Sequence, residues 1–64
     1  MDTVSQNLSL ARKYESENPL LAEAYLNAAA RGLVADGYEQ NVVDTVYRAN
    51  YLQIRAAARR GRIG

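Results

Sequence analysis

The chain has 64 residues, with seven acidic and eight basic side chains and neither cysteine nor histidine. A chain of this length forms one small domain over residues 1–64, and the missing residue types exclude disulfides, thiol nucleophiles, imidazole acid–base chemistry and metal sites built from cysteine or histidine. Because the apolar surface that so short a chain buries only roughly offsets the entropy cost of ordering it, we expect self-association to contribute to its stability.

Alanine-rich composition favours an all-α fold, since eleven alanines stand against a single proline. The first helix is expected over residues 4–15, where Val4, Leu8 and Ala11 share one face at helical spacing. A single apolar stripe of this kind is typical of an ordinary surface helix.

The second helix is expected over residues 19–36. Asn18 is predicted to cap its N-terminus, Pro19 fits the first helical position, and Gly37 supplies the left-handed residue that ends it. Apolar and small residues cover about 240° of its helical wheel, whereas packing on one partner requires little more than about 100°. We therefore expect this helix to lie at the centre of the fold.

A row of small residues, Ala24, Ala28 and Gly32, runs along the second helix at four-residue spacing. Side chains this small allow another helix backbone to approach closely. Gly32 lowers the helix propensity by about 1 kcal/mol, which a close contact would offset. The row is predicted to form part of an oligomer interface.

The third helix is expected over residues 40–60, to end at Gly61 and to form an antiparallel pair with the second. Its predicted inward face consists of Val43, Val46, Tyr47, Asn50, Ile54 and Ala57. A second apolar strip on the far side consists of Val42, Ala49, Leu52 and Ala56. One intramolecular partner cannot cover both surfaces, so the pattern predicts a homo-oligomeric helical bundle with the second strip in its interface. Asn50 is either a polar contact between subunits that fixes their register or a partly hydrated position.

Charge is distributed unevenly. Residues 1–45 carry all seven acids and three basic residues, for a net charge of −4, while residues 46–64 carry five arginines and no acid. Four of these arginines fall within about 60° of one another on the third helix, with Tyr51 at the edge of the same sector. They are Arg48, Arg55, Arg59 and Arg62.

Three interpretations of the arginines follow. Guanidinium groups at this spacing match successive phosphates of a nucleic acid or nucleotide, with the tyrosine stacking on a base. They also suit an acidic protein surface, including the N-terminal part of this chain itself. The third interpretation is a solvated face, on which the last arginines are favoured by the helix dipole.

No catalytic constellation is present in the sequence, because the acids are scattered, no glycine-rich phosphate loop occurs and the serines have no imidazole to activate them. No stretch approaches about 18 apolar residues, and the start has neither a basic segment nor an apolar run. We therefore expect a cytoplasmic protein without a membrane span, signal peptide, metal ion or cofactor.

Together these features predict a non-enzymatic helical protein that self-associates and either serves as a structural component or docks onto a larger partner. The larger partner is expected to have an acidic surface, and the small size of the chain suggests a viral or mobile-element protein. The alternative is a module that binds nucleic acid or nucleotide through its arginines.

Overall fold

The structure is a computed structural model that describes the backbone of residues 3–62 and the side chains of residues 3–60. Its described part contains three helices and no strand: α1 (Thr3–Tyr14), α2 (Pro19–Ala35) and α3 (Gln40–Arg62). The prediction of an all-α fold with three helices is confirmed.

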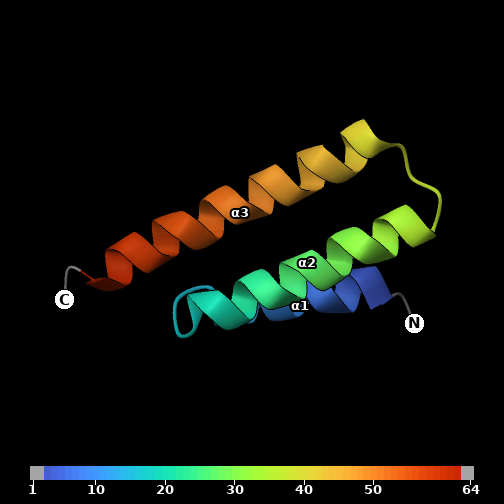
Figure 1. Cartoon of the computed structure of the whole chain (residues 1–64). Coiled ribbons are helices and arrows are strands. Elements are labelled where there is room, and N and C mark those ends of the chain that lie inside the picture. Colours follow the sequence, from blue (N-terminus) through green and yellow to red (C-terminus); the bar gives the residue numbers. More distant parts are fainter. Residues whose placement is uncertain (1–2, 63–64) are drawn as a thin grey trace.

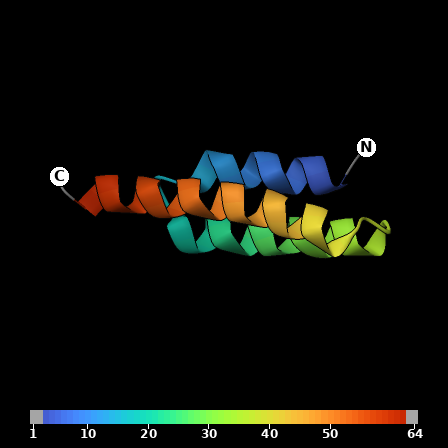
Figure 2. The same cartoon turned by 90° about the horizontal axis from the view of Figure 1, so that it is seen from above.

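The molecule is elongated. Helices α1 and α2 lie side by side, α3 lies over the pair, and the last turns of α3 extend beyond the connection between α1 and α2 (Figures 1 and 2). The Cα atoms occupy 41 × 23 × 13 Å, and their radius of gyration is 11.9 Å. A compact domain of this length has a radius of gyration of about 10.7 Å. The helices therefore form a flat bundle with little interior.

Asn18 begins α2 as the sequence predicts. The backbone N–H of Leu21 donates to the side-chain Oδ1 of Asn18 at 3.3 Å, and Pro19 occupies the first turn. The cap satisfies one of the N–H groups that have no partner inside the helix, and proline has no N–H to leave unpaired. The turn between α1 and α2 is therefore determined by local sequence.

Gly37 ends α2 with a positive φ of 87°. Its N–H donates to the carbonyl of Val34 at 3.1 Å, and the N–H of Tyr38 donates to the carbonyl of Leu33 at 3.2 Å. These two bonds form a Schellman motif, in which the left-handed residue is usually glycine. The chain thereby turns toward α3.

Gly61 does not end α3, because the helix continues to Arg62. The predicted stop at this residue is wrong. Glycine inside a helix costs only about 1 kcal/mol relative to alanine. A glycine therefore ends a helix only where a capping motif, such as the Schellman motif at Gly37, also forms.

The core is small: among residues 3–60, nine apolar side chains are buried, and four of them are alanines. They are Val4, Ala11, Ala22, Leu26, Ala29, Leu33, Val43, Ile54 and Ala57. One cluster joins Val4, Ala29, Leu33 and Val43, and the other joins Ala11, Ala22, Leu26 and Ile54. Each cluster takes two residues from α2 and one from each other helix, so the prediction that α2 is central is confirmed.

The close helix approach predicted at Gly32 is present, but it is made within the chain. A methyl group at Gly32 would lie 2.9 Å from Cγ2 of Val4 in α1, closer than carbon atoms pack. Farther along the same pair of helices, the rings of Tyr14 and Tyr25 stack with centroids 6.0 Å apart. Gly32 is therefore a contact between α1 and α2, while its predicted place in an oligomer interface stays a prediction.

Replacing Gly32 with leucine is expected to lower the free energy of unfolding by about 1–3 kcal/mol. The larger side chain overlaps Val4 and separates α1 from α2, which outweighs the gain of up to about 1 kcal/mol in helix propensity. Chemical denaturation followed by circular dichroism measures the change.

The control is Gly32→Ala measured in the parent and in a Val4→Ala background. Without the valine methyl groups the added Cβ has space, so the glycine substitution is expected to stabilise the Val4→Ala protein more than it stabilises the parent. Equal effects in the two backgrounds would contradict the proposed clash.

Candidate functional site

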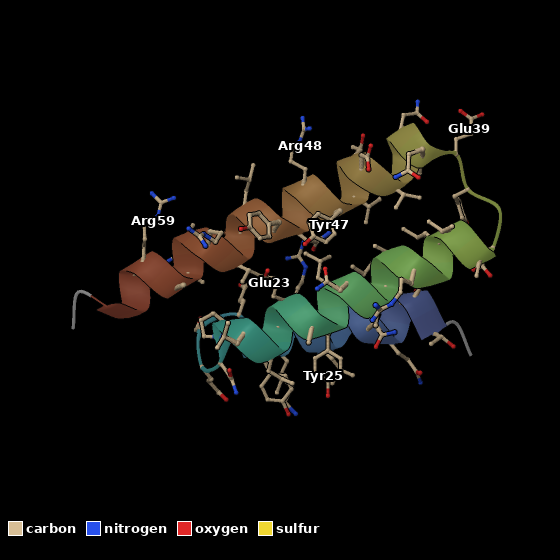
Figure 3. The ribbon with its side chains drawn as sticks, viewed as in Figure 1. Glu23, Tyr25, Glu39, Tyr47, Arg48 and Arg59 are labelled. Atoms are coloured by element: carbon tan, nitrogen blue, oxygen red, sulfur yellow. The ribbon has the colours of Figure 1, made fainter. Side chains whose placement is uncertain are left out.

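The side of α3 that faces away from α1 and α2 carries the predicted arginines. Arg48, Arg55 and Arg59 are exposed, and Figure 3 shows Arg48 and Arg59 pointing away from the other two helices. They lie opposite the buried residues Val43 and Ile54, because the inward face of α3 packs against α2. We call these three residues the arginine row. The side chain of Arg62, the fourth predicted member, lies outside the described residues.

The second apolar strip of α3 lies beside the arginine row and is largely open to solvent. Leu52 is 60% exposed and Val42 is 39% exposed. Ala49 is also exposed, and Ala56 is half-buried. We call these four residues the apolar strip. Three of its four residues are thus open to solvent, while the predicted place of the strip in an oligomer interface stays a prediction.

Tyr51 lies next to the arginine row but is already engaged on the helix surface. Its ring stacks with that of Tyr47 one turn earlier, with centroids 5.8 Å apart and planes 14° apart. One turn later, the guanidinium carbon of Arg55 lies 5.8 Å from the centroid of the Tyr51 ring. Such cation–π contacts contribute about 0.5–1 kcal/mol at exposed sites. A nucleobase stacking on Tyr51 would have to compete with these neighbours.

An open groove of about 520 Å³ separates the start of α2 from the second half of α3. Glu17 and Glu23 contribute to one wall, and Arg55 and Arg59 contribute to the other. This groove brings part of the acidic segment near part of the basic segment within one chain. Arg48 lies outside it, and Figure 3 shows the Arg59 side chain directed away from α2.

The exposed face of α2 contains apolar residues that the sequence reasoning missed. Leu20 is 81% exposed and Val34 is 54% exposed. Between them, Ala24, Asn27 and Arg31 are also exposed, and the five positions follow alternating four-residue and three-residue steps. That spacing could have identified the face. Of the predicted interface residues on α2, Ala24 therefore lies on this open face.

Two other predicted positions lie deeper. Ala28 is half-buried, beside the row that contains Ala24. Asn50 is also half-buried, and its side-chain N–H donates to the carbonyl of Val46 at 2.8 Å. The Asn50 amide thus has a partner within its own helix, and both predicted roles of Asn50 stay predictions.

Acidic side chains concentrate in the two connections between helices. Glu15 and Glu17 lie in the first connection, and Asp36 and Glu39 lie in the second. Only Glu23 and Asp44 lie within the described helices. The helical surfaces therefore carry mostly cations, while the acids occupy the ends of the bundle.

Among residues 3–62, no group of three or more potential ligand side chains could hold a metal ion. No helix in the same described range is long and apolar enough to cross a membrane. Comparisons with protein-family models, curated proteins and solved structures give no match. The candidate site is thus defined by its geometry alone.

The pKa of Tyr47 is raised above its ordinary value of 10.0 by burial, by the charge of Glu23 and by Tyr51. A raised folded-state pKa leaves stability intact below the unfolded pKa of about 10 and lowers it as the pH rises through the folded pKa. We expect the free energy of unfolding to fall above about pH 10, and Tyr47→Phe to reduce that fall. Urea denaturation between pH 9 and pH 11 measures it.

A phenylalanine at the exposed Tyr38 serves as the matched control. If Tyr38→Phe and Tyr47→Phe change the pH dependence equally, the environment of Tyr47 is not its cause.

Proposed function

We propose that this protein is a non-catalytic helical interaction module that self-associates and also docks onto a larger partner. The observation that carries the proposal is the number of large apolar side chains left exposed by an alanine-rich core. They are Leu20, Val34, Tyr38, Val42 and Leu52.

The exposed area supports the same proposal. The chain has a solvent-accessible surface of 4611 Å². A compact monomer of 7.1 kDa has about 4,100 Å² by surface scaling. The difference of about 500 Å² is the extra surface of an elongated bundle, part of which we propose a partner covers. Stable interfaces typically bury about 800 Å² on each partner, so this excess is a large part of one interface.

The exposed face of α2 is the surface best suited to self-association. Leu20 and Val34 lie at its two ends with Asn27 midway, so an antiparallel pair of α2 helices centred on Asn27 places Leu20 level with Val34 of the second copy. The charges near this face, Arg31 and the half-buried Glu23, cancel. A symmetric pair therefore brings no excess of like charge together.

Docking onto another molecule is best served by the outward face of α3, where the arginine row and the apolar strip adjoin. The alternative function is that the arginine row binds phosphate groups of a nucleic acid or nucleotide. The exposure of Arg48 and Arg59 supports this alternative. Its signature is binding to a single-stranded oligonucleotide that weakens steeply with added salt.

Light scattering at micromolar concentration tests self-association. The parent is expected to be larger than a 7.1 kDa monomer. The double variant Leu20→Gln/Val34→Gln is expected to shift toward monomer, because the apolar contact between α2 helices is lost, and to retain its helical circular dichroism.

Leu52→Gln is the matched control, since it replaces an exposed leucine on another helix and leaves the α2 face intact. It is expected to assemble like the parent. A parent that is a stable, folded monomer at these concentrations contradicts the self-association proposal.

A further inference from the structure

The outward face of α3 has the spacing of a surface that receives another helix. Val42, Thr45, Ala49, Leu52 and Ala56 follow alternating three-residue and four-residue steps over about 21 Å of helix. Such steps form a straight seam along which a second helix packs. The alanines at Ala49 and Ala56 recur every seven residues, so a helix backbone can approach closely at two points.

Covering this seam leaves no polar group of Thr45 unpaired. The Thr45 hydroxyl donates to the carbonyl of Asn41 at 2.8 Å, within α3 itself. A buried hydroxyl without a partner costs about 1–3 kcal/mol. Because this donor is satisfied before any partner arrives, the seam behaves as an apolar surface despite the threonine.

The charge beside the seam defines the chemistry of the partner. Arg48, Arg55 and Arg59 are the cations of this face, while Asp44 is its only acid among the described side chains. The Asp44 carboxylate already accepts from the side-chain N–H of Gln40 at 2.9 Å. A helix lying on the seam therefore meets a net positive flank and needs acidic residues to complement it.

A second copy of this chain does not supply such a helix. Pairing α3 with itself places two arginine rows in one interface. The exposed face of α1 carries Arg12 and Lys13 and no acid, and the exposed face of α2 carries Arg31 beside the half-buried Glu23. Four of the six acids among residues 3–60 lie in turns, so no helical face within that range complements the arginine row.

A phosphate backbone is also a poorer match than a helix. The apolar side chain of Leu52 stands among the arginines, 60% exposed, where phosphates and water give it no apolar contact. The Tyr51 ring, the obvious platform for a base, already has Tyr47 and Arg55 as neighbours. An amphipathic helix offers an apolar face to the seam and charged residues to the arginine row, so it matches both features of this surface.

We infer that the outward face of α3 binds an acidic amphipathic helix of a different protein, with the apolar strip contacting its apolar face and the arginine row contacting its carboxylates. This inference rests on the proposed function as an interaction module, and it names the partner of the docking surface. Self-association through α2 leaves this face free.

The probe is a fluorescent synthetic helix of about three heptads, with leucine and alanine along one face and glutamate on both flanks. A second peptide carries lysine in place of every glutamate. Fluorescence anisotropy is expected to show binding of the glutamate peptide to the parent, at least about tenfold tighter than binding of the lysine peptide. The difference should shrink with added salt, because the flanking ion pairs are screened.

Two variants test the face itself. Arg48→Gln/Arg59→Gln and Leu52→Gln are each expected to weaken binding of the glutamate peptide by about tenfold or more while the helical circular dichroism stays unchanged. The matched controls, Arg12→Gln/Lys13→Gln on α1 and Leu20→Gln on α2, are expected to bind like the parent. The first control removes the same number of charges, and the second removes a leucine that is 81% exposed, against 60% for Leu52.

Three outcomes overturn the inference: equal binding of the two peptides, unchanged binding by the α3 variants, or preferential binding of a single-stranded oligonucleotide that is insensitive to Leu52→Gln. The last result assigns the face to nucleic acid. Light scattering of the same samples separates these failures from a failure of self-association, since the α3 variants are expected to keep the assembly state of the parent.

Discussion

Small side chains on α2 are the constraint on which the other contacts depend. The absence of a side chain at Gly32 lets Val4 approach the α2 backbone, and Ala22 and Ala29 are almost fully buried between the helices. Helices can pack closely only where the intervening side chains are this small. Because small side chains line two sides of α2, both α1 and α3 can pack closely against it. The bundle of three helices is therefore built around α2.

The same small side chains limit how much the bundle can bury. Alanines contribute little apolar area compared with leucine or isoleucine, and Leu26 and Ile54 are the only large side chains fully buried among residues 3–60. Other large apolar residues, such as Leu20 and Leu52, are consequently left on outer faces. Exposed apolar surface is thus a direct result of how the core is built, and it gives the molecule two helical faces suited to association.

Charge distinguishes these two faces. The α2 face is close to neutral, so we propose that it pairs with a copy of itself, whereas the arginine row on the α3 face opposes such pairing. Glu39 lies in the turn before α3, and Glu17 lines only the groove beside Arg55 and Arg59, so these acids do not flank the arginines along the length of α3. Acids and arginines are separated along the sequence, and in the structure the acids lie mostly at the ends of the bundle while the arginines lie along α3. This separation favours different partners for α2 and α3.

Local signals made much of this fold predictable from the sequence. Asn18 and Pro19 define the start of α2 through bonds to their immediate neighbours, and Gly37 ends it through a motif of six residues. The inward face of α3 was predictable because Val43 and Ile54 fall on one side of a regular helix. In each case the deciding interactions are close in sequence or follow from helical periodicity.

Which helices pack together, and which of their faces stay exposed, was not predictable in the same way. The row containing Gly32 indicates a close approach without saying which helix makes it, and α1 of the same chain does. An apolar arc of about 240° on α2 does not show which part stays open, so Leu20 and Val34 were missed. The stacking of Tyr51 with Tyr47 and Arg55 depends on rotamers, which residue spacing alone does not fix.

Methyl NMR with a soluble paramagnetic agent tests most directly the claim that the two helical faces have different partners. In dilute samples the methyl groups of Leu20, Val34, Val42 and Leu52 should all be strongly attenuated. On concentration, we expect Leu20 and Val34 to become protected as α2 faces pair, while Val42 and Leu52 stay accessible. Protection of Leu52 and Val42 in the concentrated protein alone would show that copies of this chain cover α3, and it would contradict the account.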